Sequence, residues 1–209
     1  KLCESMNRRI TASPTLNLET YPGECIYIPD MLVAIVALQN YSRQNGGKYR
    51  QTVQAWLDYM QEYWIDESSG LLASMKPVHE YSVVRYPIKG SYSALSCYYL
   101  TFIDEDFAHN QYLKLKENFL QKKPFTGFRE NIDGSTWLGF DIDAGPIIFN
   151  LSPTGTAFGI GPATYFKDSL IRTGLLRTAE IAGSTITTEN KSHYLLADIA
   201  LVGEAITLA

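Results

Sequence analysis

The clearest hydrophobic pattern in the chain lies between residues 48 and 64. Apolar and aromatic residues recur there at intervals of three and four, which places them on one side of an α-helix. Polar residues, including Gln54 and Asp58, occupy the other side. The pattern therefore predicts an amphipathic helix with one buried side and one side in water.

The segment before it, residues 30–41, is apolar on nearly all sides, which is typical of a helix buried on most of its surface. Pro29 precedes this segment and suits a helix N-terminus, with Asp30 at or near the N-cap. The sequence Asn-Gly-Gly at 45–47 predicts a tight turn after the helix. The two segments together predict an antiparallel helical hairpin.

The same pair of helices recurs twice along the chain. Buried helices are predicted at 91–103 and 154–166, and each is followed by a mixed helix, at 106–120 and 168–182. The three buried helices begin 61 and 63 residues apart, and this approximate periodicity indicates a repeat architecture. Pro162 is expected to kink the third buried helix or to end it early.

The connections between hairpins, 66–90 and 121–153, are much longer than those within a hairpin. Long irregular loops in a compact domain are usually functional or disordered. Strand-like pieces at 81–86 and 147–151 favour ordered loops. In a ring of hairpins these loops emerge at one end, where we expect a pocket. A last helix is predicted at about 195–208.

The composition and motifs of the chain argue against several classes of function. The chain is 45% apolar and 19% charged, as in an ordinary globular protein, and its net charge of −4 argues against nucleic-acid binding. Its longest apolar run, 31–38, is too short for a membrane span. The cysteines and histidines form no zinc signature, and there is no phosphate loop or dinucleotide fingerprint. No metal or cofactor is therefore expected.

Candidate chemistry gathers in three segments that precede the buried helices: 21–30 (YPGECIYIPD), 86–92 (YPIKGSY) and 141–146 (DIDAGP). Paired carboxylates suit acid–base chemistry at an acetal, because one is held protonated while the other activates water. The candidate catalytic residues are Glu24, Asp30, Asp141 and Asp143. Structural roles remain open for them, with Asp30 as a helix cap and the other two aspartates as acceptors for loop amides.

Other side chains in and near these segments are candidates for binding a substrate. Aromatic rings stack on sugars or enclose an apolar ligand, but they serve equally well in a core. A lysine can neutralise an anionic group, a loop histidine can act as acid or base, and a cysteine is either a nucleophile or a small buried thiol. The candidate substrate-binding residues are Tyr27, His79, Tyr86, Lys89, Tyr92, Trp137, Phe140 and Cys25.

The runs YPGECIYIPDMLVAIVAL, YPIKGSYSALSCYYL and DIDAGPIIFNLSPTGTAF resemble the linalool dehydratase-like family of bacterial α/α toroids. The resemblance covers about residues 21–166 and implies an (α/α)6 barrel of the six-hairpin kind found in many glycosidases. Six repeats of about 60 residues need about 360 residues, so it also implies that an N-terminal part is missing. The family's alkenol branch uses cysteines and acid–base side chains around a hydrophobic pocket. The segment that matches this region is 21–30, where Cys25 is the only cysteine.

The sequence thus predicts one all-α domain, 1–209, built from repeated antiparallel helical hairpins that form part of an α/α toroid. Three functions agree with it: a carbohydrate-active enzyme using carboxylate acid–base catalysis, a hydro-lyase or isomerase acting on a small alkenol, and a non-catalytic binding or scaffold protein. The expected ligand is a small molecule or an oligosaccharide. Exposed apolar edges of a half-ring are expected to pair with another copy or with a missing N-terminal half. The compartment is open, with a periplasmic or secreted location as one alternative.

Overall fold

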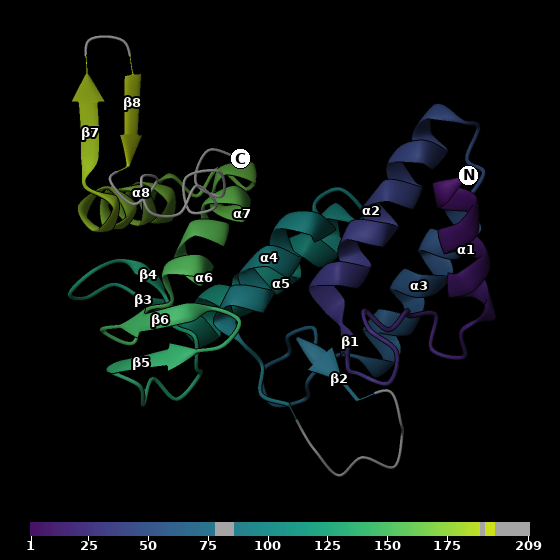
Figure 1. Cartoon of the computed structure of the whole chain (residues 1–209), viewed down its shortest axis with the longest axis horizontal. Coiled ribbons are helices and arrows are strands. Elements are labelled where there is room, and N and C mark those ends of the chain that lie inside the picture. Colours follow the sequence, from purple (N-terminus) through teal and green to yellow (C-terminus); the bar gives the residue numbers. More distant parts are fainter. Residues whose placement is uncertain (78–85, 189–190, 195–209) are drawn as a thin grey trace.

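The computed structural model describes residues 1–77, 86–188 and 191–194 of the 209-residue chain. The fold is mainly helical, as predicted, and the strands occur only as antiparallel pairs (Figure 1). The helices are α1 (Leu2–Ala12), α2 (Ile28–Gln44), α3 (Arg50–Tyr63), α4 (Gly90–Leu100), α5 (Glu105–Phe119), α6 (Pro153–Phe158), α7 (Ile160–Tyr165) and α8 (Ser169–Gly183). The strand pairs are β1 (Ile26–Tyr27) with β2 (Met75–Lys76), β3 (Leu120–Gln121) with β4 (Gly127–Phe128), β5 (Leu138–Asp141) with β6 (Gly145–Ile148), and β7 (Thr185–Thr188) with β8 (Lys191–Tyr194).

Successive helical hairpins lie side by side along the molecule. Helices α1 to α3 form one end, α4 and α5 the middle, and α6 to α8 the other end (Figure 1). Helix α4 packs against both α2 and α6, so these three helices form one continuous row. Helices α3 and α5 pack against their own hairpin partners, α2 and α4, and α8 packs against α7. The loops that precede α2, α4 and α6 consequently approach one another.

The start of α2 differs from the expected N-cap at Asp30. The helix begins at Ile28, and Asp30 lies in its first turn, where Oδ2 accepts a hydrogen bond of 2.7 Å from the Thr20 hydroxyl. Strand β1 runs directly into the helix, and the Ile28 amide at the junction donates a hydrogen bond to the Ser74 carbonyl at 3.1 Å. Pro29 needs no partner for an amide proton and suits this position.

The third predicted buried helix is divided into α6 and α7 at Gly159. Pro162 lacks an amide proton, and its ring crowds the carbonyl group four residues earlier, which disfavours a continuous helix at this point. Gly159 also lies against the ring of Phe128, since a Cβ atom at this position would be 2.3 Å from Phe128 Cε2. The expected interruption near Pro162 is therefore present, about one turn before the proline.

Some elements are absent from the sequence-based predictions, and others cannot be compared. Helix α1 and the β7–β8 hairpin were not predicted, whereas the strand-like piece at 147–151 corresponds in part to β6. The predicted final helix at 195–208 and most of the strand-like piece at 81–86 lie outside the described residues. Within the described residues, no helix is long and apolar enough to cross a bilayer.

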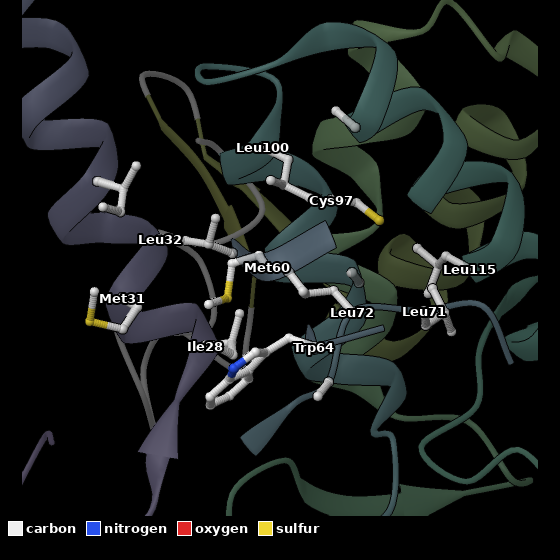
Figure 2. Packing of buried hydrophobic residues seen from close by; sticks show 14 of the residues in the cluster. Ile28, Met31, Leu32, Met60, Trp64, Leu71, Leu72, Cys97, Leu100 and Leu115 are labelled. Atoms are coloured by element: carbon white, nitrogen blue, oxygen red, sulfur yellow. The ribbon is translucent and has the colours of Figure 1, made fainter. Parts of the chain in front are cut away.

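The hydrophobic core lies between α2, α3, α4 and α5. Figure 2 shows Leu32, Met60, Cys97 and Leu100 converging from α2, α3 and α4, with Leu115 of α5 nearby. All of these side chains are buried, so each helix contributes its apolar side to one continuous cluster. Burial of this cluster is the main force that holds the hairpins together.

Leu100→Ala should test this core. Leu100 is fully buried, so we expect the substitution to lower the free energy of unfolding by about 2–5 kcal/mol. Leu113→Ala on α5 is the matched control, because this side chain is 47% exposed and the expected change is about 0.5 kcal/mol or less. Urea denaturation followed by circular dichroism measures both values. Equal losses for the two variants would contradict the packing described here.

Candidate functional site

Lys89 stands at the centre of the candidate site, immediately before α4. Its backbone amide donates to Ser74 Oγ at 2.9 Å, and the amide of Gly90 donates to the Glu130 carbonyl at 3.0 Å. A Cβ atom on Gly90 would lie 1.8 Å from the Arg129 carbonyl oxygen, so only glycine allows this close approach of two backbones. These contacts hold Lys89 in a buried position at the start of the helix.

The ammonium group of Lys89 forms salt bridges with two aspartates of the third segment. Lys89 Nζ lies 3.0 Å from both carboxylate oxygens of Asp141 and also donates to Asp143 Oδ2. Asp141 Oδ1 accepts two further hydrogen bonds, from the amides of Asp143 and Ala144, each at 2.9 Å. Asp141 therefore accepts hydrogen bonds from loop amides, which is a role that the sequence left open, and it also forms an ion pair with Lys89.

Electrostatics favour the charged forms of Lys89 and Asp141. Partial burial of Asp141 favours its neutral form, but the amide and Lys89 hydrogen bonds outweigh burial and lower the pKa of Asp141. Burial likewise opposes the charge on Lys89, yet the hydrogen bonds to Asp143 and Asp141 raise the pKa of Lys89 overall. One ammonium between two carboxylates leaves one net negative charge at the site.

Two tyrosines lie beside this cluster. Lys89 Nζ is 5.5 Å from the ring centroid of Tyr92, and the rings of Tyr92 and Tyr27 are 6.3 Å apart in an edge-to-face arrangement. Burial, followed by the negative charge of Asp143, raises the pKa of Tyr92. Burial also raises the pKa of Tyr27, with smaller contributions from Cys25 and Asp143. Both phenols consequently remain neutral and can donate hydrogen bonds to a ligand.

The rest of the first segment lies at the edge of the same site. Cys25 is half-buried, and its hydrogen bond with Tyr86 is the main cause of the raised pKa of that tyrosine. Glu24 and Asp30 are both exposed to solvent. The structure thus brings together residues from all three segments that precede buried helices, as the sequence predicts.

Two predicted aromatic residues do not join this group, and one residue cannot be placed. Trp137 and Phe140 are exposed, and the Trp137 ring contacts Phe149, with centroids 5.1 Å apart. Phe140 directly precedes Asp141 in β5, and successive side chains of a strand point to opposite sides. The structure therefore does not bring Trp137 and Phe140 together with the Lys89 cluster, and their role in binding a substrate stays a prediction. His79 lies outside the described residues.

Glu130 is a buried carboxyl group that the sequence analysis missed. Its carboxylate accepts hydrogen bonds from the Ser91 amide at 3.2 Å and the Ser91 hydroxyl at 2.8 Å. Burial raises the pKa of Glu130, hydrogen bonds with Ser91 and Ser152 act in the opposite direction, and Asp141 adds a small upward contribution. Ser152 is the N-cap of α6, so Glu130 lies between the first turns of α4 and α6. Nothing in its neighbouring sequence marks it, because Ser91 is 39 residues away.

A cavity of about 470 Å³ lies elsewhere, between the end of α3 and the start of α5. Gln61, Gln111 and Asp104 are among its lining residues, and none of the predicted site residues lines it. Gln111 already bonds to the Leu72 amide at 2.7 Å, and Asp104 caps α5 through the Phe107 amide at 2.8 Å. Gln111 and Asp104 therefore already have structural partners.

We infer the chemistry of the site from its geometry. No protein-family model matches the chain, and no curated protein matches it. In the part of the chain that the structure describes, no group of three or more His, Cys, Asp or Glu residues is arranged to hold a metal ion. Ionised carboxylates can accept a proton from a ligand, and the neutral phenols beside them can donate hydrogen bonds to its hydroxyl groups.

Glu130→Gln should change how stability depends on pH. Because the pKa of Glu130 is raised in the folded protein, its contribution to the unfolding free energy is greatest below the ordinary pKa of 4.5 and falls as pH rises towards the folded value. Gln cannot ionise, so the stability of the variant relative to the wild type should increase with pH above about 4.5.

Urea denaturation between about pH 4 and pH 8 measures this difference. Glu67→Gln is the control, because it removes a carboxyl group at an exposed position. A stability difference between Glu130→Gln and the wild type that stays constant with pH would show that the burial of Glu130 has no electrostatic cost.

Proposed function

We propose that this chain is part of an α/α-toroid enzyme that acts on a carbohydrate by carboxylate acid–base catalysis. The observation that carries the proposal is the meeting of Lys89, Asp141 and Asp143 with Tyr27 and Tyr92, which come from three separate segments. The row formed by α2, α4 and α6 supports the toroid, because such rings are built from successive hairpins laid side by side. The resemblance of the same segments to the linalool dehydratase-like family agrees with this architecture.

Asp143 is the proposed general base. Lys89 bonds to its Oδ2, and among the described residues Oδ1 makes no hydrogen bond. The side chain is 30% exposed, so Oδ1 is open to a water molecule. Asp141, in contrast, uses both oxygens for Lys89 and one of them for two backbone amides. Asp141 therefore positions the lysine and the turn, and Asp143 takes a proton from the attacking water.

Asp30 is the proposed general acid. Asp30, Asp141 and Asp143 all act electrostatically on Tyr92, so the first and third segments bring carboxylates close to the same phenol. In the proposed step, Asp30 gives a proton to the leaving glycosidic oxygen while water attacks the anomeric carbon. The carbon–oxygen bond breaks, and Asp143 accepts the proton that the water loses. The neutral hydroxyl groups of Tyr27 and Tyr92 bind sugar hydroxyls.

A hydro-lyase acting on a small apolar alcohol is the second candidate. The hydrogen bond between Cys25 and Tyr86, at the edge of the site, favours it, because a thiol and a phenol can move protons to and from an alcohol. The salt-bridged aspartates and the exposed Glu24 make the site polar, which suits a sugar better than a hydrocarbon. The carbohydrate is therefore the first proposal.

Asp143→Asn tests the carbohydrate proposal. The wild type is first screened by thermal shift and turnover with neutral oligosaccharides and aryl glycosides, and a ligand at 100 times its Kd should add about 2.7 kcal/mol of stability. Asn keeps the contact with Lys89 but cannot accept the proton, so we expect turnover to fall by about 10² to 10⁴ with little change in thermal stability. Asp58→Asn, at an exposed position on α3, should leave turnover unchanged. Equal turnover by Asp143→Asn and the wild type would exclude Asp143 as the base.

Alkylation of Cys25 tests the second candidate. If a small alcohol binds beside the thiol, a terpene alcohol should slow the reaction of Cys25 with iodoacetamide, as measured by peptide mass spectrometry. Cys97 is the internal control, because burial in the core raises the pKa of its thiol and shields it from the reagent. A Cys25 reaction rate that is unaffected by the alcohol would count against the hydro-lyase.

A further inference from the structure

The β5–β6 hairpin presents an apolar side to solvent. Leu138 pairs with Ile148 and Phe140 pairs with Pro146, and all four side chains are exposed, with Leu138 at 76% and Phe140 at 75%. Ile147, between two of them, is buried against the protein. A sheet with one side in water normally has polar residues on that side. The reversed pattern indicates that another surface covers this side of the hairpin.

The exposed apolar surface extends beyond the paired positions. Ile142 in the turn is 89% exposed, and Trp137 and Phe149 are exposed at the opposite end of the hairpin. The hairpin patch consists of Leu138, Phe140, Ile142, Pro146 and Ile148, and the contacting rings of Trp137 and Phe149 lie at its end. Five apolar side chains that each expose on the order of 100 Å² supply more than half of the roughly 800 Å² that each partner contributes to a stable protein interface. The charged groups at the two ends of the patch would contribute the remaining contact area.

The two ends of the hairpin patch carry opposite charges. Lys122 and Lys123 are exposed in the β3–β4 turn, and the neighbouring Gln121 donates to the Phe149 carbonyl at 3.0 Å. The lysines consequently lie near the Phe149 end. At the other end, the turn around Ile142 contains Asp141 and Asp143, which with Lys89 leave a net negative charge. The patch is basic at one end, apolar in the middle and acidic at the other end.

We propose that the hairpin patch binds a second copy of this chain through a two-fold axis, with the two hairpins antiparallel. A two-fold axis that lies in the interface and runs across the hairpins joins the same patch on both copies and brings the basic end of each copy to the acidic end of the other. The apolar centres then cover one another. The distribution of charge along one patch is therefore complementary to the same patch on a second copy. A partner of different sequence would not require both charges on one patch.

Pairing also stabilises the hairpin that carries Asp141. An isolated two-stranded hairpin is marginally stable in water, and within the described part of the chain β5–β6 pairs with no third strand. A second copy on its outer side would hold the hairpin in place while Asp141, on the inner side, contacts Lys89. The proposed dimer is therefore connected to the geometry of the candidate site, but it does not depend on the proposed reaction.

Sedimentation velocity from about 1 to 200 µM protein, without any ligand, tests the proposal. We expect a concentration-dependent dimer for the wild type and, for Leu138→Asp, a dimer Kd raised by about a hundredfold. Leu170→Asp on α8 is the matched control, because it is the same substitution at a side chain that is 75% exposed and lies outside the patch. A wild type that stays monomeric throughout this range would overturn the proposal. Equal dissociation by the two variants would also overturn it.

A charge-reversal variant tests the antiparallel arrangement. Lys122→Glu combined with Lys123→Glu places like charges opposite the acidic end of the other copy, so the dimer Kd should rise by about tenfold or more at low salt. Added NaCl should weaken the wild-type dimer in the same direction, because exposed charge pairs are screened. An unchanged Kd for this double variant would exclude the proposed orientation. Because neither experiment includes a sugar, failure here leaves the proposed function untouched.

Discussion

Glu130 accepts hydrogen bonds from the amide and the hydroxyl of Ser91, while its backbone carbonyl accepts one from Gly90. Gly90 and Ser91 belong to the first turn of α4. Ser152, the N-cap of α6, interacts with the carboxyl group of Glu130. The N-terminal turn of α4 therefore faces a buried acid, and Ser152 at the start of α6 interacts with the same group. Lys89 directly precedes this turn, so the position of its ammonium group depends on this contact.

The carboxyl groups around Lys89 differ because their surroundings differ. Burial raises the pKa of Glu130, whereas the amides and the lysine outweigh burial at Asp141 and lower its pKa. Neighbouring acids with pKa values moved in opposite directions are typical of sites that exchange protons. Here the buried acid supports the backbone, and Asp143 keeps one oxygen available to a ligand. Acidic residues of similar type thus have different roles: Glu130 supports the backbone, and Asp143 is available for chemistry.

The β5–β6 hairpin combines two roles through the alternation of strand side chains. Its inner side provides Asp141, which joins the third segment to Lys89 of the second. Its outer side exposes Leu138 and Phe140, which have little to pack against within the described chain. A surface of this composition is costly in water, because apolar area gains free energy when it is covered. The same short element therefore links the candidate site to the proposed pairing of two copies.

The helices could be predicted from the sequence because their signals are local. A period of 3.6 residues is visible within a single helix such as α3, and the turn at 45–47 is marked by its own glycines. The three segments with candidate chemistry were likewise visible, since each precedes a predicted buried helix. The residues in each segment could be identified in this way, but the partners of their side chains could not.

Tertiary structure alone decided which of these residues act together. Lys89 and Asp141 are 52 residues apart, and Glu130 and Ser91 are 39 apart, so no local pattern records either contact. The orientation of Phe140 away from Asp141 depends on a strand pairing that the sequence did not predict at that position. The physical reason is that helical periodicity is set by neighbouring residues, whereas burial and ion pairing exist only after distant segments have packed.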